Sequence, residues 1–421
     1  MPPSWTALFN DSWKKLNPCD VLLVRGDGDC GYVYKGKAYA PLIDSIGDLG
    51  IMRNLVIESV AIPYSKLIGQ SAYSSPVSYN RSALFVGLIR RIIWFIRGRA
   101  KGESWANNQR MHIWDLILKK TDPKCVIGIQ PDVGLCRAGR IHDIPVFDLQ
   151  HGVIDDGNPW YSEKYRSETP EKDLPSGFLC WDESSAAILR KWAPQKGINV
   201  EVVGNPWFVR FLIENPDDSL VREIIHTERI FNNHKPVILV SLQWGLDFYY
   251  KNDTFNGVMV DALEKVILET ADSYNWLLRL HPVQLRAIKK EEIRNYLENT
   301  FGHLSSVEWG TCSELPLPVL LRQVDLHITD MSSIVVEAGW MGIYSALLNS
   351  NIRCGGSLQH MFMYERETGL AQVLPQDRSI VMQWIEKTLI KGKRNVSLNN
   401  MEKALSSFIN YISSTVEAKR K

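Results

Sequence analysis

The sequence lacks both a long apolar run and an excess of charge of either sign. Its apolar stretches stay well below the ~20 residues needed to cross a bilayer, and residues 1–5 carry no basic-then-apolar secretion signal. Its 48 Lys and Arg oppose 47 Asp and Glu, a formal net charge of +1, whereas nucleic-acid binders usually show a basic excess. We therefore expect a soluble or peripheral cytoplasmic protein that binds no nucleic acid.

Cysteine pairs and the common catalytic signatures are also missing. The seven cysteines are scattered and form no CxxC pair, which argues against a disulfide framework and against a zinc site. The chain has no GxxxxGK(S/T) loop, no HExxH and no GxSxG, so P-loop proteins, zinc proteases and α/β-hydrolases are disfavoured. We expect no bound metal and no resident cofactor.

The chain does contain a regular alternation of short apolar runs and helical stretches. Its 421 residues, 45% hydrophobic, can bury two substantial cores, and the alternation indicates parallel sheets covered by helices. The predicted strands are 21–25, 55–62, 125–129, 146–149, 177–181, 200–203, 236–241, 276–280, 326–328 and 344–348. The predicted helices are 111–120, 183–192, 257–273, 291–300, 383–390 and 401–416.

These elements divide into two α/β halves of comparable size. Residues 1–207 form the first domain, which ends where Asn205-Pro206 breaks the pattern. The charged, helical stretch 208–235 is interpreted as the inter-domain connection, 236–400 as the second domain and 401–421 as a C-terminal helix. The predicted fold class is α/β, with two Rossmann-like domains facing across a cleft.

The stretch 325–340 is where we expect the second domain to bind a phosphate. It reads as a short buried strand, a polar corner and a helix that starts at Ser332 and Ser333, capped by Asp330 or Ser332. The amides of a first helical turn and two adjacent hydroxyls can hold a phosphate. Glu337, about one turn further on, could accept both hydroxyls of a ribose. The alternative is a capped crossover helix with Glu337 in solvent.

Other predicted strands also end in polar residues beside glycine or proline. Gln243 and His281 follow two strands of the second domain. Ligands of open α/β sheets bind beyond the carboxyl ends of the strands, so we predict that both residues join the phosphate site, with His281 donating to a phosphate oxygen. A capped strand end is the alternative for His281.

His151 follows a strand of the first domain and precedes Gly152. A neutral imidazole can take a proton near pH 7, so His151 is the candidate general base. A structural histidine is the alternative. Asp155, in the same loop, could face an acceptor as a second catalytic residue, although 155–157 also has the composition of a turn.

Asp27 and Asp29 flank Gly28 directly after the first predicted strand. Some sugar-transferring enzymes hold a divalent metal and the donor diphosphate with such an aspartate pair. Three residues around a glycine are also the usual composition of a solvated turn. We favour the turn, with Asp27 kept as a further possible base.

Residues 82–99 (SALFVGLIRRIIWFIRGR) form a basic, apolar segment unlike the rest of the chain. The longest apolar run in it, 83–89, is too short to span a bilayer. Four arginines (90, 91, 97 and 99) border a stripe of Leu, Ile, Trp and Phe, which suits a helix lying on an anionic membrane surface. The alternative is a core helix with snorkelling arginines.

In these motifs the chain resembles bacterial glycosyltransferases of the two-Rossmann-domain (GT-B) type. It is most similar to polysialyltransferases, Kdo transferases and the polyol-phosphate polymerases of teichoic acid synthesis. The motifs that carry the resemblance are Gln150-His151-Gly152, Leu280-His281-Pro282, and 329–333 with Glu337.

The resemblance implies roles for the same residues. His281, Ser332 and Ser333 would contact the phosphates of a donor. Glu337 would bind the ribose or the sugar, and His151 would act at the acceptor or the leaving group. The polymerases usually have Trp where this chain has Gln150, which favours a sugar donor over a polyol-phosphate donor.

We therefore expect a transferase at the inner face of the cell membrane. It would move a sugar from a nucleotide donor, CMP- or UDP-linked, to a growing surface polysaccharide or lipopolysaccharide glycan. The second domain would bind the donor, and the first would bind a glycan or lipid-linked glycan acceptor. The alternatives are a CDP-polyol-dependent polyol-phosphate transferase, a non-catalytic glycan- or nucleotide-binding module, and a nucleotide-sugar 2-epimerase.

Overall fold

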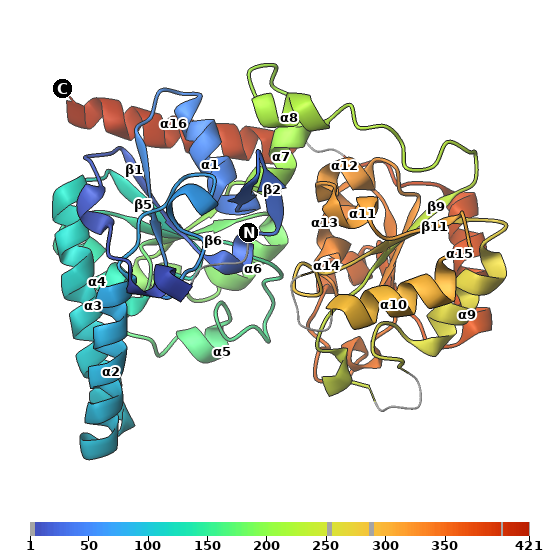
Figure 1. Ribbon diagram of the computed structural model, residues 1–421, viewed down its shortest axis with the longest axis horizontal. Coiled ribbons are helices and arrows are strands. Elements are labelled where there is room, and N and C mark those ends of the chain that lie inside the picture. The colour runs from blue at the N-terminus through green and yellow to red at the C-terminus, as the bar shows by residue number, and fades with distance from the viewer. Residues whose placement is uncertain (1–4, 251–254, 286–289, 397–398, 421) are drawn as a thin grey trace. The chain divides into compact units, whose positions relative to one another are not determined.

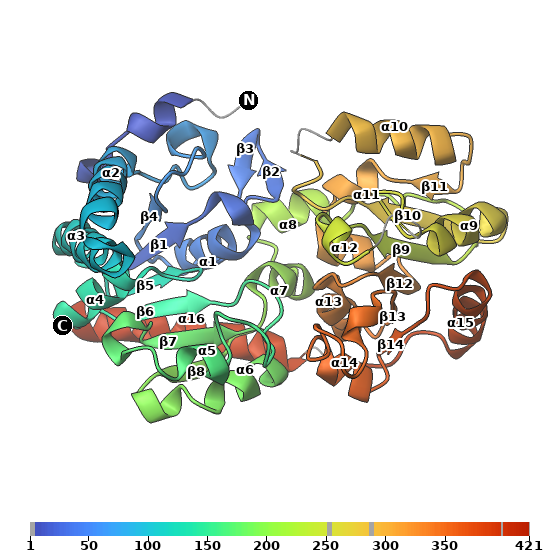
Figure 2. The same cartoon turned by 90° about the horizontal axis from the view of Figure 1, so that it is seen from below.

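The computed structural model describes residues 5–250, 255–285, 290–396 and 399–420. The chain forms two compact units, Met1–Arg222 with Asn399–Lys421, and Glu223–Leu398. Each unit contains a six-stranded parallel sheet covered by helices (Figures 1 and 2). The predicted α/β class with two Rossmann-like domains is confirmed.

The first unit contains all six strands that the sequence predicts for it. Its strands are β1 (Val21–Arg25), β2 (Tyr32–Tyr34), β3 (Lys37–Tyr39), β4 (Ile57–Ala61), β5 (Cys125–Gly128), β6 (Val146–Leu149), β7 (Gly177–Cys180) and β8 (Asn199–Val202). The sheet order is β4-β1-β5-β6-β7-β8. All five residues of β1 are buried, as expected for a parallel strand covered on both faces.

Helices cover the sheet of the first unit. They are α1 (Pro41–Ile51), α2 (Asn80–Arg97), α3 (Arg99–Thr121), α4 (Val133–Ile141), α5 (Glu163–Arg166), α6 (Glu183–Arg190), α7 (Pro206–Ile213), α8 (Ser219–Ile224) and α16 (Asn399–Arg420). Asp132, Asp182 and Asn205 cap α4, α6 and α7 by accepting from first-turn amides. Local sequence therefore sets where these helices start.

The second unit repeats the same construction. Its strands are β9 (Val237–Ser241), β10 (Asn275–Arg279), β11 (Val307–Glu308), β12 (Leu326–Thr329), β13 (Tyr344–Leu347) and β14 (Ala371–Val373), in the order β11-β10-β9-β12-β13-β14. The four predicted strands are present. The two missed strands, β11 and β14, are two and three residues long at the sheet edges, too short to show a period. The helices are α9 (Asp261–Thr270), α10 (Lys290–Phe301), α11 (Thr311–Glu314), α12 (Leu317–Leu321), α13 (Ile334–Trp340), α14 (Met363–Glu367) and α15 (Arg378–Lys391).

The division between the units differs from the predicted connection at 208–235. Phe208 and Phe211 of α7 are fully buried, and the Arg210 guanidinium donates twice to the Asp218 carboxylate at 2.7 Å. These contacts make α7 part of the first core, so the chain leaves that unit only after Arg222. The C-terminal helix α16 also belongs to the first unit.

A hairpin, β2–β3, is an element that the sequence analysis did not identify. Lys35 and Gly36 connect its strands with φ values of +50° and +73°, the left-handed pair typical of a tight hairpin turn. Its aromatic side chains pack with two aromatic residues from elsewhere in the unit; the cluster consists of Tyr32, Tyr34, Tyr39, Tyr73 and Trp207. The alternating aromatic residues around Lys35-Gly36 were the available signal.

Helix α2 is not the core helix that the sequence left as an alternative. Of its 18 residues, those classed as buried are Asn80, Ala83 and Val86, and Phe95 is 94% exposed. Figure 1 shows α2 beside α3 as a helical hairpin. Among the described residues, no helix combines the length and the apolar character needed to cross a membrane.

In the second sheet, His327 links three neighbouring strands. Its Nε2 is 2.9 Å from the Ser241 hydroxyl on β9, and its Nδ1 is 2.9 Å from the Ser345 hydroxyl on β13. The side chain is fully buried, and this burial lowers the pKa of His327 to about 3. The imidazole is therefore neutral in the folded protein.

Acid should weaken the fold through His327. The unfolded chain binds a proton at a pKa of 6.5 and the folded chain only at about 3, so the stabilisation is present above pH 6.5 and is lost as the pH falls toward 3. From pH 7 to 5 the loss is about 2 kcal/mol. Urea unfolding measures the free energy of unfolding of wild type and of His327→Gln. The difference between the two should be smaller at pH 5 than at pH 7 by this amount. A pH-independent difference would contradict a neutral His327.

Candidate functional site

Three neighbouring strand ends of the second unit carry the residues predicted to bind the donor. Ser241, near the end of β9, pairs with Arg279 of β10 on one side and Thr329 of β12 on the other. Gln243, His281 and 330–333 follow these strands directly. The structure therefore brings these predicted residues to one edge of the sheet, as the parallel arrangement requires.

Two glutamine side chains join these strand ends. The Gln243 Oε1 accepts from the Met331 amide at 2.7 Å, and the Gln243 carbonyl accepts from Gln284 Nε2 at 3.0 Å. The Gln284 Oε1 accepts in turn from the His281 amide at 2.8 Å. Gln243 was predicted as a ligand contact, and its side-chain oxygen and carbonyl fix neighbouring loops. Gln284 is 4% exposed and had no sequence signal, since its partner Gln243 lies far along the chain.

The His281 ring is oriented by a backbone contact. Its Nδ1 accepts from the Val283 amide at 3.1 Å, so the hydrogen of the neutral imidazole lies on Nε2. The ring lies beside Trp244, with 6.3 Å between the ring centroids. In this tautomer Nε2 is a hydrogen-bond donor, as a phosphate contact requires.

Of the two side chains predicted to cap the serine helix, Ser332 accepts from a first-turn amide and Asp330 does not. The Ser332 hydroxyl accepts from the Ile334 amide at 3.3 Å, and the Ser332 amide donates to Thr329 Oγ1 at 3.3 Å. Asp330 does not cap the helix, because its buried carboxylate accepts from the Tyr250 hydroxyl. Burial raises the pKa of Asp330 to about 6.

These hydrogen bonds leave fewer backbone amides for a phosphate than the sequence predicted. The amides of Met331, Ser332 and Ile334 already donate within the protein, and α13 is only seven residues long. The contribution of free amides and of the helix dipole to anion binding is therefore smaller than the sequence suggested. The hydroxyls of Ser332 and Ser333 and the His281 ring remain the main polar groups of this edge.

Glu337 is buried rather than solvated, so the alternative that places Glu337 in solvent is wrong. Its side chain lies in the buried face of α13 at 8% exposure. Burial raises the pKa of Glu337 to about 8, and the charge of Arg279 opposes the shift. The Arg279 guanidinium donates to the carbonyls of Cys312 and Leu315, and burial lowers its pKa. At neutral pH Glu337 is largely protonated, and it can both donate and accept a hydrogen bond.

In the first unit, Gln150 shapes the turn that carries His151. Gln150 is 2% exposed; its Nε2 donates to the Gly152 carbonyl at 2.8 Å, and its Oε1 accepts from the Trp181 amide at 2.7 Å. Gly152 has φ +119°, a conformation that favours glycine. His151 is exposed, although the surrounding protein removes part of its hydration and lowers its pKa.

The other predicted carboxylates of the first unit lie in turns. Asp155 Oδ1 accepts from the Gly157 amide at 2.7 Å, which confirms the turn. Asp27 lies in the short 3-10 turn Asp27–Asp29. Its carboxylate accepts from the Ser65 hydroxyl and from the Lys66 amide. The aspartate pair is thus a structural turn. Across the described ranges, no three His, Cys, Asp or Glu side chains lie together as a metal site would need.

Asp148 is a buried acid that the sequence analysis did not single out. It lies in β6, three residues before His151, and accepts from the Gln130 amide at 2.8 Å. Burial raises the pKa of Asp148 to about 7, with the Gln130 bond and the charge of Arg166 opposing the shift. An acid inside an apolar strand, Val146-Phe147-Asp148-Leu149, was the available signal.

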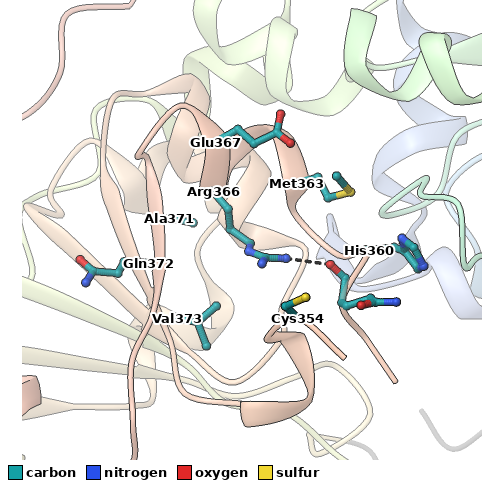
Figure 3. Close-up of a pocket in the computed structure, with 9 residues that line it drawn as sticks. Cys354, His360, Met363, Arg366, Glu367, Ala371, Gln372 and Val373 are labelled. Atoms are coloured by element: carbon teal, nitrogen blue, oxygen red, sulfur yellow. Dashed lines mark hydrogen bonds between the residues drawn. The ribbon is translucent and has the colours of Figure 1, made fainter. Parts of the chain in front are cut away.

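A cavity of about 630 Å³ lies beside β14 in the second unit (Figure 3). Arg366 points toward the Gln359 carbonyl, to which its Nη1 donates at 2.8 Å. The lining residues are Cys354, Gln359, His360, Met363, Arg366, Glu367, Ala371, Gln372 and Val373. The lining includes none of the residues predicted for the donor or for catalysis.

No protein family and no curated protein matches the sequence, but solved structures match the fold. The chain is similar to a UDP-GlcNAc 2-epimerase from Neisseria meningitidis, with a TM-score of 0.55 and 14% identity over 94% of this chain and 100% of that chain. For the wall teichoic acid polymerase TagF, the TM-score is 0.55 at 12% identity over 99% and 93% of the two chains. At these identities the likeness shows a GT-B-like fold alone.

Removing the side-chain carboxamide of Gln243 should weaken the hydrogen-bonded junction of the three strand ends. In Gln243→Leu, the Met331 amide loses its acceptor, which should lower the free energy of unfolding by about 1–2 kcal/mol. Hydrogen exchange at the Met331 amide should accelerate. Gln372→Leu, at an exposed position on β14, is the matched control and should change neither quantity. Equal exchange rates in wild type and Gln243→Leu would show that the bond does not hold the corner.

Proposed function

We propose that this chain is a nucleotide-sugar-dependent glycosyltransferase. The observation that supports this most is the hydrogen-bonded junction of β9, β10 and β12, which gathers His281, Ser332 and Ser333 at one sheet edge. The fold supports the proposal, because one similar structure is an epimerase bound to UDP-GlcNAc. The donor is a CMP- or UDP-linked sugar, and the acceptor is a growing surface polysaccharide or lipopolysaccharide glycan at the cytoplasmic face of the membrane.

The donor-binding chemistry uses few charged groups. The Nε2–H of His281 and the hydroxyls of Ser332 and Ser333 donate to the phosphate oxygens and stabilise the charge that develops on the leaving phosphate. The protonated carboxyl of Glu337 bonds the ribose or the sugar. Gln243 and Asp330 act by positioning the serine corner, through the Met331 amide and the Tyr250 hydroxyl.

The first unit supplies the acceptor side of the reaction. His151 takes the proton of the acceptor hydroxyl, because its lowered pKa keeps the imidazole neutral at physiological pH. Gln150 and Gly152 hold the turn that presents it. Asp155 is the weaker candidate, since its carboxylate already accepts within its own turn.

Polyol-phosphate transfer is the second candidate function. The match to the teichoic acid polymerase, which was soaked with CDPG, covers 99% of this chain, and the same phosphate contacts would serve a CDP-linked polyol. The epimerase match has the same TM-score and covers 94% of this chain. Incubation with CDP-glycerol, CDP-ribitol and nucleotide sugars, each with a bacterial membrane extract as acceptor, separates transfer of either kind from epimerisation. A non-catalytic module would bind without turnover.

Nucleotide binding should depend on the edge of the second sheet. A thermal-shift panel of CMP, CDP, UDP and GDP identifies the base, and calorimetry then measures its affinity. His281→Ala and Ser332→Ala should each weaken binding on the order of tenfold to a hundredfold, because each loses a hydrogen bond to a charged phosphate.

Matched controls at exposed positions of the same unit are His303→Ala and Ser357→Ala. Both should bind like wild type, and all four variants should keep the wild-type circular dichroism spectrum. Wild-type nucleotide affinity in His281→Ala and Ser332→Ala would refute the donor site.

Loss of His151 should remove turnover while leaving donor binding intact. In His151→Ala, the rate of transfer should fall about a hundredfold or more, while the nucleotide affinity stays that of wild type. The control is His112→Ala, at an exposed position on α3. Since a lowered pKa keeps the base deprotonated in mild acid, the acid limb of the rate profile should lie below pH 6.5. Unchanged turnover in His151→Ala would exclude it as the base.

A further inference from the structure

Helix α2 exposes an apolar stripe from Phe85 to Ile96. The stripe consists of Phe85, Leu88, Ile89, Ile92, Phe95 and Ile96, which recur at three- and four-residue intervals and so share one helix face. The exposed fractions rise toward the end of the helix, to 94% for Phe95 and 70% for Ile96. Contiguous exposed apolar surface of this kind marks an interaction site.

Packing against α3 fixes the direction of the stripe. Gly102 of α3 lies against α2 so closely that an added Cβ would be 3.0 Å from the Arg90 carbonyl and 3.2 Å from the Trp94 Cβ. Arg90 and Glu103 form an ion pair across the helices at 3.1 Å. These contacts use the opposite face of α2, so the stripe stays on the outside of the hairpin.

The end of this hairpin is strongly basic. Arg91, Arg97, Arg99 and Lys101 are exposed, and Glu103, the acidic residue of this part of the hairpin, is already paired with Arg90. The Arg99 guanidinium lies 5.3 Å from the centre of the Trp94 ring. We call Arg91, Arg97, Arg99 and Lys101 the basic tip.

We propose that the apolar stripe and the basic tip dock on an anionic lipid surface. Aromatic and aliphatic side chains enter the boundary between headgroups and acyl chains, while the arginines and the lysine pair with lipid phosphates. A second copy of this chain with its stripe stacked in parallel would bring two uncompensated basic tips together, which disfavours that pairing. The helix lies along the surface, over ~27 Å for 18 residues. The contact is independent of the proposed reaction, since it uses no residue of the candidate site.

Vesicle sedimentation of the full-length protein tests this contact. Wild type should bind vesicles of phosphatidylcholine with phosphatidylglycerol and should bind pure phosphatidylcholine far less. Arg91→Glu/Arg97→Glu/Arg99→Glu should lower the partition coefficient on the order of a hundredfold, from roughly fivefold per basic residue. Ile92→Ser/Phe95→Ser/Ile96→Ser should lower it roughly tenfold or more. Arg90 is left unchanged, because it forms the ion pair with Glu103 of α3.

A charge-matched control separates this site from general attraction to anionic lipid. Lys15→Glu/Lys120→Glu/Lys172→Glu reverses three exposed charges of the same unit and should bind like wild type. Circular dichroism confirms that each variant folds. Wild-type binding in either α2 variant would overturn the proposal, and so would absence of binding by wild type. A concentration-dependent dimer in analytical ultracentrifugation that the serine variant dissociates, without vesicle binding, would assign the stripe to a second copy instead.

Discussion

The candidate donor site depends on the way two glutamine side chains join the ends of three parallel strands. Backbone groups beyond the carboxyl ends of parallel strands leave the ladder and need other partners. Gln243 satisfies the Met331 amide, and Gln284 bridges the Gln243 carbonyl and the His281 amide. The His281 backbone and the serine corner are therefore both tied to the loop at Gln243, one through Gln284 and the other directly.

Buried acids accompany both candidate regions. Asp148 lies three residues before His151, and Glu337 lies four residues after Ser333; burial raises the pKa of these acids to about 7 and about 8. Both therefore titrate near neutral pH, which is more common at functional sites than in ordinary cores. A carboxyl that is partly protonated can donate as well as accept, which suits hydroxyl-rich ligands such as ribose and sugars.

The α2 hairpin illustrates a different kind of constraint. The same 18 residues are compatible with a core helix or with a surface helix, because both need one apolar face. What separates them is whether another element covers that face. Here α3 packs on the opposite side through Gly102 and the Arg90–Glu103 ion pair, and Phe95 and Ile96 remain exposed.

The sequence by itself determined the α/β class, the ten main strands and the strand ends at which Gln243, His281 and His151 would lie. Those features follow from local apolar patterning, which is complete within each segment. Only the tertiary structure decided that α7 belongs to the first core, that Asp330 bonds Tyr250 rather than the helix, and that Glu337 is buried. Each of these depends on partners far apart in the chain, whose approach no local pattern encodes.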